Sequence, residues 1–172
     1  MFFSSRADDA VETSIGGDDV KIERAGKRFT VDVQFLVPVR RAVAWAVVTD
    51  FEHMTEFIPN LTLSQVVSRG HDSVRIRQKA VGYLGPFPVE VESVREVQMS
   101  HPREIRARGV GGNVEKIESV MTLEAVGEGT QIRYHVEAEP DFWFPPLIGP
   151  AMVRKKTVEQ FTALIAEMRR RR

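Results

Sequence analysis

Four polar residues able to do chemistry occupy strand positions where apolar side chains are the rule: Gln78, Arg95, Ser119 and Tyr134. Side chains two positions apart in a strand share one face of a sheet. The residues that share a face with these four are mostly valine, isoleucine and methionine, so that face should point inward. A buried polar group needs a hydrogen-bond partner, which a ligand or water in a cavity would supply.

Arg95 gives the sharpest expectation of the four. It shares a face with Val89, Val91 and Ser93, and an unpaired buried arginine is costly. It should therefore meet an anionic or carbonyl group of a ligand, or an internal acid. A bulge that turns the side chain outward, or a place at the rim of the sheet, is the alternative, and the sequence leaves both open.

The usual general bases are missing from this inward face. Two histidines, His71 and His101, fall in turns, and His135 falls on the opposite face. No pair of histidines has metal-ligand spacing, and the absence of cysteine excludes disulfides, thiolate metal sites and cysteine nucleophiles. We expect no catalytic residue, metal or cofactor, and an enzyme that used Arg95 and Tyr134 is the alternative.

The elements that position these residues follow from periodicity and turn residues. Alternation and Gly, Pro or Asn punctuation predict strands near 20–24, 29–37, 61–69, 73–82, 88–98, 103–110, 114–126 and 130–139. Helical spacing predicts two short helices over 39–49 and 50–58. The short connections after residue 61 predict an antiparallel meander.

Opposite charges mark the outer face of this meander. Folding the hairpins predicts four cross-strand pairs, namely Lys79 with Glu90, Arg77 with Glu92, Glu96 with Arg106, and Arg106 with Glu118. Such pairs contribute only tenths of a kcal/mol to about one each. Their use here is to show which face is wet, and hence that Gln78 and Arg95 lie on the other one.

The chain ends in a long amphipathic helix, which we place within 145–172. Apolar residues recur there at three- and four-residue steps or their multiples, and four arginines close the sequence at the negative end of the helix dipole. So long a stripe needs a large apolar surface opposite it. Candidates to line a space between helix and sheet are Met121, Met152 and Phe161, and direct packing without a cavity is the alternative.

Several aromatic and apolar residues are candidates for the mouth of such a cavity. Phe57 and Ile58 end the second short helix, Tyr83 and Phe87 flank a hairpin turn, and Trp143 precedes the long helix. Exposed apolar loops often act as gates or docking patches. Ordinary packing against the helix is the alternative for each.

Size and composition fit a soluble globular protein. The chain has 172 residues, 42% hydrophobic and 28% charged, with 24 basic and 24 acidic residues. A net charge of zero gives no global field to attract nucleic acid. We expect a flexible arm over 1–19 and one domain over 20–172, and no apolar run approaches the length of a membrane helix.

One stretch resembles a known family. Residues 43–52 read VAWAVVTDFE and are followed by FIPN at 57–60. This is similar to the signature of the START-like (SRPBCC) branch that holds coenzyme-Q-binding START proteins, ribosome-association toxins and polyketide cyclase/dehydrase-like proteins. The order of elements over roughly 30–168 also looks like its helix-grip fold. The resemblance implies an α+β fold, with a curved antiparallel sheet wrapped around the C-terminal helix and two short helices after the first long strand.

Together these features predict a non-catalytic protein that binds or carries a hydrophobic small molecule such as a lipid, isoprenoid quinone or polyketide. A cyclase or dehydrase enzyme and a protein-interaction module of the ribosome-association kind are the alternatives. We expect a cytoplasmic or membrane-peripheral protein and no nucleic-acid partner, and the sequence leaves open a transient contact with a membrane or another protein. It names neither the ligand nor the oligomeric state.

Overall fold

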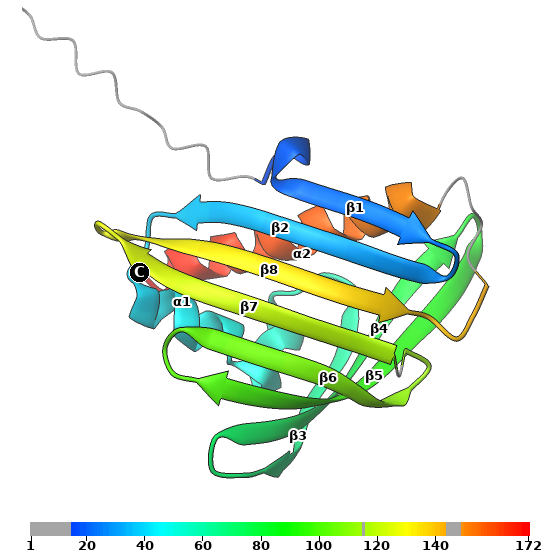
Figure 1. The fold of residues 1–172 in the computed structure, drawn as a ribbon, viewed down its shortest axis with the longest axis horizontal. Helices are drawn as coiled ribbons and strands as arrows, with labels where there is room; N and C mark the ends of the chain where they lie inside the picture. The colour runs from blue at the N-terminus through cyan, green and yellow to red at the C-terminus, as the bar shows by residue number, and fades with distance from the viewer. Residues whose placement is uncertain (1–14, 115, 144–148) are drawn as a thin grey trace, which may run out of the picture.

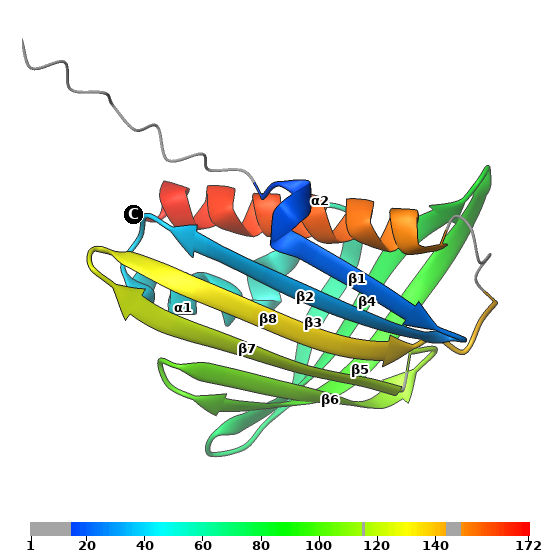
Figure 2. The same ribbon diagram turned by 45° about the horizontal axis from the view of Figure 1, so that its top comes forward.

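The computed structural model describes residues 15–114, 116–143 and 149–172. Within them, a strongly curved antiparallel sheet wraps around one long helix (Figures 1 and 2). The strands are β1 (Val20–Ala25), β2 (Arg28–Val37), β3 (Leu61–Arg69), β4 (Ser73–Leu84), β5 (Phe87–Ser100), β6 (Glu104–Gly112), β7 (Lys116–Val126) and β8 (Gly129–Glu139). The helices are η1 (Gly17–Asp19), α1 (Arg41–Val48), η2 (Phe51–Glu56) and α2 (Gly149–Arg170), where η marks a 3-10 helix.

The sheet runs β1-β2-β8-β7-β6-β5-β4-β3. The last strand therefore pairs with β2, while the helical pair α1 and η2 leads from β2 to the far edge at β3. Helix α2 runs inside the curve and packs against β1 and α1. This confirms the predicted α+β helix-grip arrangement, with two short helices between the first long strand and the rest of the sheet.

Of the first nineteen residues, which we predicted to form a flexible arm, the structure describes those from Ile15 onward. Residues 1–14 of the expected arm lie outside the described residues. Ile15 is buried in the core, and Arg154 of α2 donates hydrogen bonds to the carbonyl oxygens of Gly17 and Val20 at 2.9 and 2.7 Å. Residues 15–19, which we assigned to the arm, thus pack against the domain.

The hairpins differ from our predictions in register but not in face. The β4–β5 turn is tight, with Leu84 opposite Phe87, so Lys79 lies across from Glu92. Because long side chains reach diagonally, the expected pairs still form: Arg77 Nε lies 2.7 Å from Glu92, and Lys79 Nζ lies 3.3 Å from Glu90.

The third and fourth predicted pairs are wrong. Arg108 rather than Arg106 lies opposite Glu118. Glu96 meets Arg108 at 2.8 Å, and Arg106 meets Glu104 at 2.6 Å. Each hairpin is shifted by two residues relative to our alignment, and a shift of two preserves the alternation of faces. The inward and outward sets of residues are therefore as predicted.

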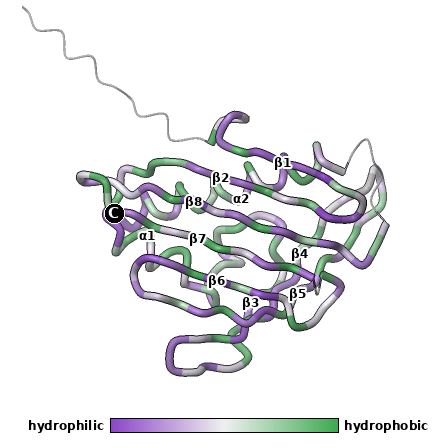
Figure 3. Tube along the Cα trace, in the orientation of Figure 1, coloured by the Kyte–Doolittle hydropathy of each residue, from purple (hydrophilic) through white to green (hydrophobic). Residues whose placement is uncertain are grey.

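The core lies between the concave face and α2. Fully buried side chains include Val33, Ile132 and Leu123 on the strands and Met168 on the helix, and hydrophobic and hydrophilic positions alternate along much of the sheet (Figure 3). Ala151, one of the apolar residues of α2, is exposed. None of the described helices is both long and apolar enough to cross a membrane.

Candidate functional site

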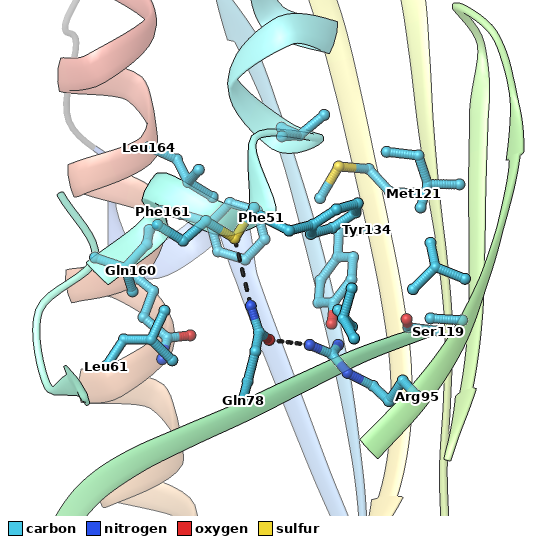
Figure 4. Close-up of a pocket in the computed structure, with 17 residues that line it drawn as sticks. Phe51, Leu61, Gln78, Arg95, Ser119, Met121, Tyr134, Gln160, Phe161 and Leu164 are labelled. Carbon is cyan, nitrogen blue, oxygen red and sulfur yellow. Dashed lines mark hydrogen bonds between the residues drawn. The ribbon is translucent and has the colours of Figure 1, made fainter. Parts of the chain in front are cut away.

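A cavity of about 180 Å³ lies between the sheet, η2 and the C-terminal half of α2 (Figure 4). We call it the inner chamber. Its walls are mostly apolar, with five polar side chains among the described residues that line them: Gln78, Arg95, Ser119, Tyr134 and Gln160. Four of these are residues predicted from strand alternation, so the sheet brings them to one place, whereas Ser93, which shares the predicted inward face, lines neither this cavity nor the second one, which adjoins it.

Strand register explains how the polar side chains converge. Arg95 of β5 lies opposite Ile76 of β4, one inward position from Gln78. Ser119 lies on β7, and Tyr134 lies on β8 opposite Met121. Because all of them occupy inward positions of a curved sheet, their side chains point toward the common centre of curvature (Figure 4).

A chain of hydrogen bonds fixes the Gln78 amide. The Ser64 hydroxyl donates to the Phe51 carbonyl oxygen at 2.5 Å, and Gln78 Nε2 donates to Ser64 Oγ at 2.9 Å. The amide nitrogen therefore faces Ser64, which turns Gln78 Oε1 toward Arg95, where it accepts a hydrogen bond from Nη2. Gln78 is thus held as an acceptor for the guanidinium.

Arg95 carries a charge that the described protein does not balance. Within the described ranges, no carboxylate lies within the 4.0 Å of an ion pair with its guanidinium, and its Nε has no hydrogen-bond partner. Burial lowers its pKa, and the nearby Tyr134 partly offsets this. An uncompensated buried ion costs several kcal/mol even after relaxation. The fold tolerates this cost at a cavity wall, where a bound group can meet the charge.

Tyr134 places a hydroxyl beside this charge. Burial raises the pKa of its phenol, while Arg95 and the Ser119 hydroxyl act in the opposite direction. The phenol therefore stays protonated at neutral pH and can donate a hydrogen bond into the chamber. Figure 4 shows the hydroxyl end of Tyr134 on the same side of the chamber as Arg95 and Ser119.

A second cavity of about 310 Å³ adjoins the first. This outer chamber lies between the N-terminal half of α2 and the ends of β4, β5 and β8. Its walls are dominated by apolar residues, including Val81, Val91, Val136, Met152 and Val153.

Polar side chains of α2 also border the outer chamber. Lys156 pairs with Glu159 at 3.1 Å, and the Thr157 hydroxyl donates to the Val153 carbonyl oxygen at 2.8 Å. Since both polar groups already have partners in the protein, the outer chamber presents mainly apolar surface to a ligand.

Tyr134, Gln160 and Phe161 line both chambers. They form a waist between the two spaces. The Phe161 ring packs against Tyr134 and Phe35, with ring centroids 5.4 and 5.7 Å apart. No group in the described ranges hydrogen-bonds the Gln160 side chain, although it lies on the inward side of α2. The waist therefore combines the packed rings of Tyr134 and Phe161 with the unpaired amide of Gln160.

The predicted site residues divide into three groups. Seven line the inner chamber: Ile58, Gln78, Arg95, Ser119, Met121, Tyr134 and Phe161. Met152 lines the outer chamber, which Tyr134 and Phe161 also border.

Four predicted residues line neither chamber: Phe57, Tyr83, Phe87 and Trp143. Phe57 lies under the Arg171 guanidinium, 5.5 Å from ring centroid to Cζ, and Arg171 also pairs with Asp50 at 2.8 Å. The other three are exposed at 55%, 69% and 71%. Phe144, the next residue in the chain, lies outside the described residues.

Sequence reasoning missed Ser64, Met54 and Gln160. Irregular pairing of β3 at Leu61/Leu63 and Val66/Ser68 shifts its alternation, so the strand does not read as having a clear inner face. Gln160 was missed because a search for an apolar stripe passes over polar residues. Its four-residue spacing from Leu164, which places both on one helical face, was the available signal.

The described residues do not suggest metal chemistry. They contain no group of three or more histidine, aspartate or glutamate side chains placed to hold a metal ion. No described lining residue of the inner chamber is acidic or a histidine. Its chemistry is that of one cation, two hydroxyls and two amides.

Residues 28–171 match the model of a protein family described as polyketide cyclase / dehydrase and lipid transport. This chain belongs to that family. No curated protein matches its sequence significantly. The match spans every strand from β2 onward and all of α2, so both chambers lie inside the family's domain.

Solved structures show the same fold in proteins of different description. An aromatase/cyclase from Streptomyces sp. R1128 aligns with a TM-score of 0.70 at 15% identity, over 84% of this chain and 95% of that one. A STAR-related lipid transfer protein from Xanthomonas axonopodis aligns at 0.66 and 13% identity, over 88% and 99%. A START superfamily protein from Mycobacterium smegmatis aligns at 0.63 and 18%, over 83% and 95%. At these identities the likeness shows the fold alone.

Proposed function

We propose that this protein binds or carries a hydrophobic small molecule in the two chambers between its sheet and α2. The observation that carries the proposal is the uncompensated Arg95 at the wall of an otherwise largely apolar cavity. Pockets for small ligands are typically apolar with a few placed polar groups. The family description, which includes lipid transport, points the same way.

The chambers supply both affinity and orientation. Burial of ligand surface contributes about 25 cal/mol per Å², and the apolar walls of both chambers provide the matching surface. Gln78, Arg95, Ser119 and Tyr134 would orient the polar end, while Ile58, Met121, Met152 and Phe161 would contact the apolar part. Among our other sequence candidates, Phe57 would act through packing of η2, since it lines neither chamber.

The entrance is proposed at the outer chamber, between the β4–β5 hairpin and the start of α2 (Figure 2). Gly82 and Phe142 line that chamber, and the next residue in each case, Tyr83 and Trp143, is more than half exposed. Exposed aromatic rings of this kind, with Phe87 beside them, suit transient contact with a membrane surface during loading.

A cyclase or dehydrase is the second candidate. The protonated Tyr134 phenol beside the Arg95 guanidinium could polarise a ligand carbonyl and stabilise an enolate. Such chemistry also needs a base, and the described lining of the inner chamber contains no histidine or carboxylate. The binding function is therefore the better supported of the two.

The test is to purify the protein from its own source, extract it with organic solvent, and identify what is released. A stoichiometric lipid, quinone or polyketide would support the proposal and name the class. If nothing is released and a panel of hydrophobic ligands leaves the melting temperature unchanged, the binding function is refuted. Conversion of a released polyketide by the purified protein would favour the enzyme.

A further inference from the structure

The inner chamber presents one positive charge and no negative charge from the described residues. Among the described residues, Arg95 has one acceptor, Gln78, and its Nε–H has none. The Gln78 amide nitrogen donates a hydrogen bond to Ser64 Oγ. Turning this nitrogen toward a ligand would break that hydrogen bond. The polar end of the chamber is thus built to receive an acceptor that is itself negatively charged.

The waist connects this charge to the outer chamber. Tyr134, Gln160 and Phe161 face both spaces, so a ligand with its polar end at Arg95 and a long body would pass between them. Among the described residues that line the outer chamber, the one cation is Lys156, which Glu159 already neutralises. The far end of the ligand therefore meets valine and methionine side chains rather than a second charge.

We infer that the ligand is a single-chain amphiphile with one anionic group, of the carboxylic acid class. Its acid group lies on Arg95, and its chain runs past Tyr134, Gln160 and Phe161 into the outer chamber. The inference rests on the proposed function and makes it specific, because it states the charge, the direction and the shape of the bound molecule.

The charge and the hydrogen-bond donors of the inner chamber fit a monoanion. One guanidinium balances one negative charge, and a carboxylate accepts its parallel N–H donors in a bidentate pair. The hydroxyls of Ser119 and Tyr134 lie beside the guanidinium and can donate to the same group. A phosphate dianion would leave a net negative charge in a buried space that holds no second cation among the described lining residues.

The first experiment compares saturated carboxylic acids with the primary alcohols of equal chain length. Affinities are measured by calorimetric titration of the full-length, delipidated protein. The acids should bind about tenfold to a hundredfold more tightly than the alcohols, as expected for a charge-assisted hydrogen bond. In Arg95→Gln the ratio should fall to about twofold, while alcohol affinity stays near that of the unchanged protein.

Arg108→Gln is the matched control. Arg108 belongs to the same sheet but lies on the outer face, paired with Glu96. Its replacement should leave the ratio of acid to alcohol affinity unchanged. Near-native circular dichroism of each variant separates a lost contact from a lost fold.

The second experiment varies chain length. Each added methylene should tighten binding about fourfold until the outer chamber is full, after which affinity should level off. Met152→Trp narrows the outer chamber alone, since Met152 does not line the inner one. In this variant the affinity should level off at a shorter ligand chain length, while the ratio of acid to alcohol affinity is preserved.

The outcomes separate this inference from the proposed function. Equal binding of acids and alcohols would overturn the anionic head, and a Met152→Trp variant with unchanged length dependence would overturn the direction. In either case binding of hydrophobic molecules would still stand. If neither acids nor alcohols bound but another hydrophobic compound did, the ligand class would be wrong. Failure of every hydrophobic compound would refute the proposed function itself.

Discussion

Arg95→Met should make the ligand-free protein more stable, although it removes a hydrogen bond. The guanidinium is desolvated, and in the described part of the chain it meets no carboxylate within ion-pair distance. Methionine keeps the length of the side chain and removes the charge. The account of the site therefore predicts a stabilising substitution at the very residue proposed to hold the ligand.

The magnitude follows from three contributions. Removing a desolvated charge should contribute several kcal/mol, which we reduce to about 2–4 kcal/mol because a chamber of about 180 Å³ has room for water. Leaving Gln78 Oε1 without its donor should cost about 1–2 kcal/mol. Apolar burial of the methionine adds about 1 kcal/mol. The net gain is about 1–4 kcal/mol, or a rise in melting temperature of about 3–12 °C for a chain of this size.

The assay is thermal and urea unfolding of delipidated protein, with Arg108→Gln as an outer-face control. The double variant Gln78→Leu/Arg95→Met removes the unpaired amide oxygen as well, so it should be at least as stable as the single variant. An added saturated carboxylic acid should raise the melting temperature of the unchanged protein but have little effect on the melting temperature of either variant. A lower stability of both variants, with the control unaffected, would refute the view that Arg95 carries an uncompensated charge.

Three further predictions concern stability elsewhere. The hydrogen bond from Arg170 holds the pKa of buried Glu167 at about 2, against 4.5 ordinarily, so its stabilisation is present above pH 4.5 and lost as pH falls from there toward 2. Glu167→Gln should lower the free energy of unfolding at pH 7 by about 1–3 kcal/mol and reduce the pH dependence below 4.5, and an unchanged acid limb would contradict this. Ser64→Ala should cost about 1–2 kcal/mol and weaken ligand binding by releasing Gln78, and unaltered calorimetric affinity would argue against that link. Gly112→Ala should cost about 2–4 kcal/mol in urea unfolding, because φ is +89° and a Cβ would lie 2.2 Å from the Glu92 carbonyl oxygen, whereas wild-type stability would show that the turn can relax.

Much of the fold could be predicted because alternation and turn residues act locally. The bounds of β3 were predicted at 61–69 as observed, and the inward face of β4 and β5 was correct even though the register was off by two. A two-residue error changes partners but not faces. Arg95 and Gln78 were therefore found on the cavity side, although Arg106 was given the wrong partners.

The rest of the site depends on contacts that sequence does not show. Ser64 lies behind Gln78 and holds its amide, in a strand whose alternation is shifted by pairing irregularities. Gln160 faces the inner chamber because α2 presents polar as well as apolar residues to the cavity. Phe57 packs under Arg171, and this contact joins the residue after η2 to the residue after α2. Each of these outcomes needs the tertiary arrangement of elements distant in sequence.

The central claim is that a hydrophobic ligand occupies the space between the sheet and α2. Native mass spectrometry of protein purified from its own source tests it most directly when a cavity-filling variant is included. Ala107 lines the inner chamber, and Ala107→Phe should fill part of it, whereas Ala125→Phe adds the same ring at an exposed position. The account predicts a stoichiometric added mass in the unchanged protein and in Ala125→Phe, and its loss in a folded Ala107→Phe variant. Two results would contradict it: the same added mass at full occupancy in Ala107→Phe, or no added mass in any of the three proteins.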